Sequence, residues 1–155
     1  MVDFHSHCLP ALDDGAADLN ESIAMLSASV QQGVDTVVAT PHFYSKQESI
    51  EQFLSRRKVS FEQLGGHVPD GLTVLTGAEV LLQEGVSRLD LRDLCVGDTN
   101  YILLELPFMP PPSWLYDELE SIALGQRLDV ILAHADRATT ASKNGKSLFP
   151  KTPVC

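Results

Sequence analysis

The sequence predicts an α/β protein built on a parallel β-sheet, and three observations support this prediction. Short apolar runs rich in β-branched residues alternate with segments whose apolar residues recur at helical spacing. Glycine and proline mark the boundaries of several of these segments. The chain of 155 residues is 44% hydrophobic and 21% charged, which suits one domain with a buried core. Strands that are joined through helices pair in parallel, with right-handed crossovers.

Residues 1–5 are expected to form a brief first strand. The helix after it is predicted over 20–32, with Asn20 as its cap and Gly33 at the position that glycine favours after a helix. The β-branched run VDTVVAT (34–40) is predicted to be a buried second strand. The residues expected on the buried face of this helix are Ile23, Leu26 and Val30.

The second helix is predicted over 47–64, because apolar residues recur there on one face and Gly65 follows. The segment LTVLTGAEV (72–80) is expected to be the third strand, and a less regular pattern over 84–94 indicates another helical region. The residues expected to be buried on the second helix are Ile50, Phe53, Leu54 and Phe61.

The fourth strand is predicted at YILLELP (101–107) and the fifth at LDVILAHA (128–135), with a helix over 113–126 between them. The composition then changes. Residues 138–155 contain three lysines but no acidic residue and no histidine, and they show no clear period. This segment is therefore interpreted as a divergent tail.

Charge and cysteine content narrow the function classes. The formal net charge of −10 argues against a nucleic-acid surface, which requires a basic face. No apolar run reaches the length of a bilayer span, and Asp3 interrupts any signal peptide, so a cytoplasmic location is expected. Cys8, Cys95 and Cys155 are scattered and suit reduced thiols; a buried Cys8 is expected, although a ligand thiol also fits.

Side chains that bind metals follow the predicted strands at the point where each strand ends. They are His5, His7, Asp13 and Asp14 after the first strand, His42 after the second, Glu79 at the end of the third, Glu105 at the end of the fourth and His134 at the end of the fifth. The carboxyl ends of parallel strands share one edge, where ligands bind. These residues are therefore expected to converge on one small volume.

The spacing of His5 and His7 puts both imidazoles on one side of a strand, so both can reach one ion. Histidine nitrogen with carboxylate oxygen suits Mn, Fe or Zn, whereas a set of carboxylates alone would suit Mg or Ca. The number of candidates exceeds what one tetrahedral ion requires. A carboxylate such as Glu79 could bridge two ions, and paired ions commonly hydrolyse phosphate esters.

Each residue also fits a structural role. Asp13 and Asp14 could be turn residues before Gly15, and His134 could be a hydrogen-bonded core histidine. Glu105 is the stronger candidate, because a carboxylate in an apolar strand is costly unless it is paired or binds a metal. The coincidence of ligand types at five strand ends favours the metal centre.

Five motifs resemble, in order, those of the PHP (polymerase and histidinol phosphatase) superfamily: DFHSHCLPALDDGA, VVATPHFY, GAEV, ILLELPF and ILAHADR. More closely, they resemble the bacterial manganese-dependent protein-tyrosine phosphatases of capsule and exopolysaccharide regulation. The resemblance covers residues 1–137, a PHP phosphatase domain, and implies a distorted (β/α)7 barrel with a trinuclear metal centre. The ligands it implies are His5, His7 and Glu79 for one ion, Glu79, Glu105 and His134 for a second, and Asp14 and His42 for a third.

The resemblance also implies a reaction. Arg137 matches an arginine that contacts the substrate phosphate and, with Asp14 and His42, forms the candidate catalytic group; a guanidinium fork suits phosphate oxygens. Two or three ions, expected to be Mn with Fe, Zn or Mg also fitting, would hydrolyse phosphotyrosine on a bacterial tyrosine kinase. Cys8 does not lie in the CxxxxxR pattern of cysteine-based phosphatases.

The chain also departs from the family pattern. His-Ala-Asp-Arg stands at 134–137 where the family normally has His-Pro-Glu-Arg, and no Asp-x-His pair follows. The barrel is therefore expected to be incomplete at its C-terminal end, with weak or no activity unless another chain completes it. Two alternatives stay open: a phosphatase of a small phosphomonoester such as histidinol phosphate, and a truncated domain that binds metal without turnover. The oligomeric state is not predicted.

Overall fold

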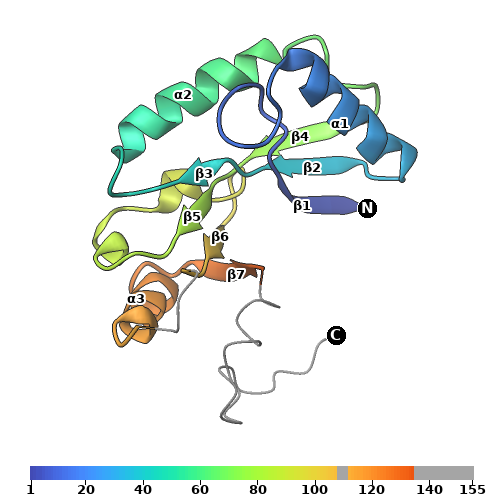
Figure 1. Cartoon of the computed structure of the whole chain (residues 1–155). Helices are drawn as coiled ribbons and strands as arrows, with labels where there is room; N and C mark the ends of the chain where they lie inside the picture. Colours follow the sequence, from blue (N-terminus) through green and yellow to red (C-terminus); the bar gives the residue numbers. More distant parts are fainter. Residues whose placement is uncertain (108–111, 135–155) are drawn as a thin grey trace.

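The computed structural model describes residues 1–107 and 112–134, and these form seven parallel strands in two sheets (Figure 1). The predicted α/β class and parallel pairing are confirmed. Within the described ranges both sheets are open and do not close into a barrel. The strands of the first sheet, in spatial order, are β1 (Val2–Ser6), β2 (Thr36–Ala39) and β4 (Thr73–Thr76); those of the second are β3 (His42–Phe43), β5 (Glu79–Leu81), β6 (Tyr101–Glu105) and β7 (Asp129–Ala133).

The two sheets join after β2 and after β4, where the chain passes from one sheet to the other. The chain passes from β2 to β3 through Thr40 and Pro41, and from β4 to β5 through Gly77 and Ala78. Pro41 lacks the N–H that a continuous ladder needs. A Cβ at Gly77 would lie 3.4–3.5 Å from the side chains of three neighbours. The strand predicted over 34–40 is therefore shorter, with a short further strand after Pro41, and the single strand predicted over 72–80 is divided in two.

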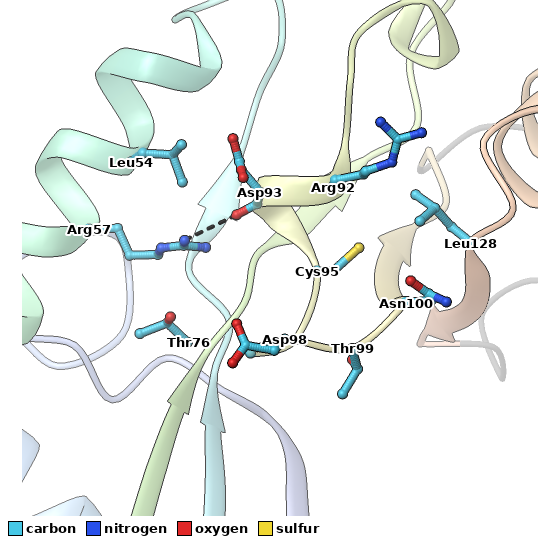
Figure 2. A pocket seen from close by; sticks show the side chains of 11 residues that line it. Leu54, Arg57, Thr76, Arg92, Asp93, Cys95, Asp98, Thr99, Asn100 and Leu128 are labelled. Atoms are coloured by element: carbon cyan, nitrogen blue, oxygen red, sulfur yellow. Dashed lines mark hydrogen bonds between the residues drawn. The ribbon is translucent and has the colours of Figure 1, made fainter.

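Arg57 braces this junction from outside the sheets. One of its guanidinium nitrogens donates to the carbonyl of Gly77 at 2.7 Å. Another donates to the carbonyl of Asp93 at 3.1 Å, as Figure 2 shows. The guanidinium also lies 5.5 Å from the centre of the Phe53 ring. Burial lowers the pKa of Arg57, whereas the charge of Asp93 opposes that shift. Beside it lies a cavity of about 650 Å³, which is bordered by Thr76, Cys95 and Leu128 among others.

The first two helices form close to their predicted positions. Helix α1 (Leu19–Gln31) begins at Asp18, whose carboxylate accepts from the Glu21 N–H at 2.9 Å, so the prediction of Asn20 as cap is wrong. Helix α2 (Ile50–Gln63) begins at a capping box in which the side chains of Ser49 and Gln52 bond each other's main chain. The capping residue of α1 therefore lies before the predicted Asn20, while the helix itself forms close to its predicted position.

The helix predicted over 84–94 is wrong, because this segment forms two short 3-10 turns, Val86–Arg88 and Arg92–Leu94. Some of its main-chain groups bond within these turns, and others bond side chains of the next element instead of forming a helical ladder. Glu118 accepts from the N–H groups of Gly85 and Ser87, and Gln126 donates to the carbonyls of Ser87 and Leu89. Both side chains belong to or follow α3 (Leu115–Glu120), which continues into a π-helical turn over Ser121–Gly125.

Two clusters of buried side chains stabilise the sheets, and α2 packs against both. Phe53 belongs to the cluster beneath the second sheet, and Phe61 packs against the cluster beneath the first. Figure 1 shows α1 and α2 along one face of the sheets and α3 beside β7. Val30 is 36% exposed, contrary to prediction, whereas Cys8 is fully buried as expected. None of the described helices has the length and apolar run that spanning a bilayer requires.

Candidate metal centre

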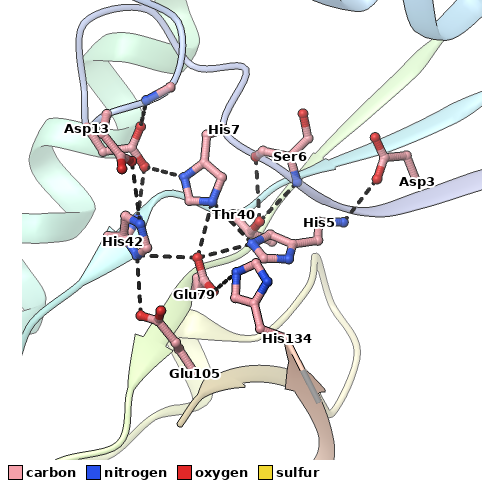
Figure 3. A network of polar contacts seen from close by, with 12 residues as sticks. Asp3, His5, Ser6, His7, Asp13, Thr40, His42, Glu79, Glu105 and His134 are labelled. Carbon is pink, nitrogen blue, oxygen red and sulfur yellow. Dashed lines mark hydrogen bonds and ion pairs between the residues drawn. The ribbon is translucent and has the colours of Figure 1, made fainter. Parts of the chain in front are cut away.

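The two sheets bring together all seven predicted metal ligands. His5 lies on β1 and His7 just after it, His42 and Glu79 begin β3 and β5 at the sheet junction, and Glu105 and His134 come at the ends of β6 and β7 (Figure 3). Asp14 approaches from the loop between β1 and α1 (residues 7–18), here called the β1–α1 loop. Arg137 lies outside the described residues. Because β3 and β5 pair with His42 opposite Glu79, these two ligands are fixed by strand register.

Glu79 lies at the middle of this group. Its side chain is fully buried. Its Oε2 lies 3.0 Å from Nε2 of His5, 3.1 Å from Nε2 of His7 and 3.2 Å from Nδ1 of His42. Its Oε1 lies 3.5 Å from Nε2 of His134. One buried carboxylate therefore faces nitrogen atoms from β1 and the residue after it, from β3 and from the end of β7.

The polar atoms of this group face one another. Both oxygens of Glu79 and Nδ1 of His42 are buried, and among the described residues the groups that face them are the imidazoles and carboxylates of the group itself. A buried polar atom is costly unless a partner binds it. Nitrogen and oxygen donors that converge at these distances suit Mn, Fe or Zn, so the residues present fit such ions. The structural observation thus agrees with the metal centre that the sequence predicts.

Among the described residues, three sets of side chains offer ligand atoms that lie within 4.8 Å of one another. The first contains His5, Glu79 and His134, the second His7, His42 and Glu79, and the third His7, Asp13 and Asp14. Glu79 belongs to two sets, as expected of a bridging carboxylate. The sets distribute the histidines differently from the resemblance, which groups His5 with His7 and His42 with Asp14.

Asp13 orients His7 by a strong hydrogen bond. Its Oδ2 lies 2.6 Å from Nδ1 of His7 and also accepts from the main-chain N–H of His42 at 3.0 Å, while Oδ1 accepts from the N–H of Gly15. With Nδ1 held by a carboxylate, Nε2 of His7 is directed at Glu79 and can bind a metal. Burial raises the pKa of Asp13, but the bond to His7 and the two main-chain donors outweigh burial and lower it.

The charges of the centre depend on one another. Hydrogen bonding to Asp13, followed by Glu79, raises the pKa of His7 to about 10 in the absence of metal, although burial opposes this shift. Burial raises the pKa of Glu79, but the close imidazoles of His5 and His7 outweigh it and bring the value to about 2. At neutral pH the metal-free site therefore holds a protonated His7 beside an ionised Glu79. A divalent ion would have to displace that proton.

The remaining ligands lie around this pair. Glu105 is 5% exposed, and its Oε2 lies 3.8 Å from Nδ1 of His42. The Asp14 side chain is 81% exposed, with Oδ1 3.4 Å from Nε2 of His42. His134 has a positive φ of 52°, a conformation that costs energy in a residue other than glycine and is common at functional sites.

Sequence reasoning missed Tyr44. Its ring stacks on His42, with centroids 5.3 Å apart and an interplanar angle of 19°. Burial, followed by the charges of Glu105 and Asp14, raises the pKa of Tyr44. The residue lies within the quoted motif VVATPHFY, but nothing in its spacing separates an aromatic ring at the site from one in the core.

Comparison with known proteins finds one matching family model and several similar tyrosine-protein phosphatases. Residues 1–148 match the model of a family described as capsular polysaccharide synthesis, CpsB/CapC. The chain is 34% identical to tyrosine-protein phosphatase YwqE of Bacillus subtilis, over 96% of this chain and 59% of YwqE. It is 30% identical to tyrosine-protein phosphatase CpsB of Streptococcus pneumoniae, over 94% of this chain and 61% of that protein.

The fold is similar to that of a solved structure from work on the crystal structures of YwqE from Bacillus subtilis and CpsB from Streptococcus pneumoniae. Those two proteins are described there as unique metal-dependent tyrosine phosphatases. The TM-score is 0.68 at 33% identity, over 88% of this chain and 56% of the other. The chain thus spans about three fifths of the length of these curated relatives.

Proposed function

The chain belongs to the CpsB/CapC family of capsular polysaccharide synthesis. On that premise we propose that it is a metal-dependent protein-tyrosine phosphatase. The relatives named as tyrosine-protein phosphatases support this activity. The observation that carries the proposal is Glu79, a fully buried carboxylate whose two oxygens face four imidazoles. Nitrogen and oxygen atoms gathered in this way around one buried carboxylate suit divalent cations of the Mn, Fe or Zn type.

The ligands proposed for two or three ions, Mn in the first place, are His5, His7, Asp14, His42, Glu79, Glu105 and His134. Bound divalent ions would polarise the phosphoryl group and lower the pKa of water. Asp13 keeps Nε2 of His7 turned toward the ions, and Glu79 joins two ligand sets. Arg137 is proposed to contact the substrate phosphate, and Asp14 and His42 are proposed as catalytic residues with it.

The proposed substrate is phosphotyrosine on a protein, namely a bacterial tyrosine kinase of capsule or exopolysaccharide synthesis in the cytoplasm. The family's description as a capsular polysaccharide synthesis family supports this choice. A small phosphomonoester such as histidinol phosphate is the alternative substrate. The motifs LPALDDGA and ATPHFY favour the tyrosine phosphatases.

The test measures metal and turnover on the same preparation. The chain is freed of metal, titrated with Mn²⁺ and assayed with a phosphotyrosine peptide and with histidinol phosphate, alongside a Glu79→Gln variant. We expect bound Mn²⁺ and weak hydrolysis that is faster with the peptide than with histidinol phosphate, both lost in the variant. Preference for histidinol phosphate would overturn the substrate class. Metal binding without hydrolysis of either substrate would instead support a metal-binding domain without turnover.

A further inference from the structure

Helix α2 contacts the β1–α1 loop, which carries Asp13 and Asp14. This loop folds on itself through main-chain bonds: the N–H of Ala11 donates to the carbonyl of Ala16 at 2.8 Å, and the N–H of Ala16 donates to the carbonyl of His7 at 3.0 Å. Ala11 has a positive φ of 52°. An alanine in this conformation is strained, so groups outside the loop must stabilise it.

Arg56 of α2 supplies one such group. Its Nη1 donates to the carbonyl of Leu12 at 3.2 Å, and this carbonyl belongs to the residue just before Asp13. The rest of the guanidinium is held by Glu48, with Nε 3.0 Å from Oε2 and Nη2 2.6 Å from Oε1. A guanidinium fixed in this bidentate way directs its remaining N–H groups in a set direction. The fork therefore fixes the direction of the bond to Leu12.

Ser60 supplies a second group, one turn further along the same helix. Its hydroxyl donates to the carbonyl of Pro10 at 2.7 Å, and the residue is only 4% exposed. Residues four positions apart lie on the same face of a helix. Arg56 and Ser60 thus hold two carbonyls of the loop, on either side of the strained Ala11.

We propose that Arg56 and Ser60 are positioning residues of the metal centre, which hold the β1–α1 loop so that Asp13 and Asp14 face His7 and His42. The consequence concerns distances. Asp13 must stay 2.6 Å from Nδ1 of His7 to direct that imidazole, and the exposed Asp14 has only a 3.4 Å approach to His42. A loop released from α2 would loosen both aspartates without moving His5, Glu79 or the end of β7. This inference rests on the proposed metal centre.

The test compares Arg56→Ala and Ser60→Ala with two matched controls. Arg92→Ala removes an exposed arginine whose ion pair is with Asp90 and not with the β1–α1 loop. Ser29→Ala removes a partly buried hydroxyl that bonds the carbonyl of Met25 within helix α1. Hydrogen exchange is measured on the metal-free chain at the amides of Ala11 and Ala16 and, for reference, in β6. Mn²⁺ binding is measured by calorimetry.

We expect both α2 variants to speed exchange at the two loop amides but not in β6. We also expect them to weaken the weakest Mn²⁺ binding step by roughly tenfold, as is typical when a supporting residue of a metal ligand is removed, while the tightest step is kept. The controls should change neither quantity. Unchanged loop exchange, or faster exchange shared by β6, would overturn the inference.

The metal measurement separates this inference from the proposed function. A chain without substitutions that binds no Mn²⁺ contradicts the proposed metal centre, whereas the exchange data still decide whether α2 holds the loop. Equal weakening of every Mn²⁺ binding step would also overturn the inference, because it assigns Arg56 and Ser60 to the aspartates and not to the whole centre.

Discussion

The Glu79 carboxylate has four imidazole nitrogens within 3.5 Å and is shielded from water. Its role as a ligand depends on its negative charge, which burial disfavours and the surrounding histidines restore. Substitutions at this residue separate the two roles that a buried carboxylate could have, in metal binding and in fold stability.

Glu79→Gln is expected to abolish most Mn²⁺ binding, because a neutral amide is a poor bridging ligand and two ligand sets share this side chain. Metal content after gel filtration measures the effect. The matched control is Glu118→Gln, which removes another buried carboxylate, one that accepts from the N–H groups of Gly85 and Ser87 outside the centre. Unchanged metal content in Glu79→Gln would contradict the assignment.

The titration of His7 predicts how the effect of metal depends on pH. Its folded pKa of about 10 lies above the ordinary 6.5, so the protonated form stabilises the metal-free fold fully below 6.5, and this stabilisation is lost as pH rises toward 10. Glu79 behaves oppositely: its stabilisation is present above the ordinary 4.5 and is lost as pH falls toward 2.

Above pH 6.5 we therefore expect the metal-free chain to lose stability, and the increase in melting temperature caused by Mn²⁺ to grow, because fewer chains carry the competing proton on His7. Thermal scans with and without Mn²⁺ measure both trends. The Asp13→Asn variant should show a weaker trend, since it removes the largest cause of the shift. A Mn²⁺ effect independent of pH would refute the prediction.

The candidate ligands could be predicted because they lie at or after the ends of apolar runs, a pattern that can be read from the sequence alone. The structure brings all seven together, although the metal roles given to them stay predictions. The partners of those ligands could not be predicted in the same way. Whether Asp13 bonds His7 or only shapes a turn depends on the path of the β1–α1 loop, and the residue that holds this path, Arg56, lies on an exposed helix face with no local signal.

At the scale of elements, the β1–α1 loop leaves no room for a side chain at Gly15. A Cβ there would overlap the carbonyl oxygen and the Cβ of His7. Gly15→Ala is expected to cost about 1–3 kcal/mol in the free energy of unfolding, as overpacking usually does, and to weaken Mn²⁺ binding by displacing His7. Urea unfolding and calorimetry measure these effects.

The control for Gly15→Ala is Gly125→Ala, where a Cβ would meet no atom within 4 Å. This control should leave metal binding unchanged. Wild-type Mn²⁺ affinity in Gly15→Ala would mean that the loop can move away from His7 at no cost to the centre.

Arg57 gives a prediction for the sheet junction. Arg57→Ala removes donors from the carbonyls of Gly77 and Asp93 and is expected to cost about 1–3 kcal/mol in the free energy of unfolding. Urea unfolding measures the loss, with Arg92→Ala, an exposed and ion-paired arginine, as the neutral control. Equal losses in the two variants would show that the bonds to the junction add nothing specific.

Sequence patterns predicted the existence of strands and long helices better than their interruptions. Helix α2 was predictable from its apolar period, whereas the division of β4 from β5 at Gly77 depends on how closely three neighbouring side chains pack there. The segment 84–94 has helical spacing, yet Glu118 and Gln126 satisfy its main chain from a distance in sequence. Such long-range partners have no signature in a local window.

For the molecule as a whole, the proposed ions would connect both sheets, because their ligands come from β1, β3, β5, β6 and the end of β7. We expect calorimetric unfolding to be a single transition that Mn²⁺ moves upward. A concentration of one hundred times Kd stabilises a one-site fold by about 2.7 kcal/mol. Two transitions, with only one responding to Mn²⁺, would contradict a centre shared by the sheets.

The breaks after β2 and β4 also have a consequence for fidelity of folding. Because β3 continues β2 and β5 continues β4, the alignment of Val37 with Val74 carries through to that of His42 with Glu79. A one-residue slip in the apolar sheet would turn its side chains to the opposite face. The same slip would separate the imidazole from its carboxylate. The position of His42 opposite Glu79 thus depends on the pairing of two valines that are not themselves part of the polar centre.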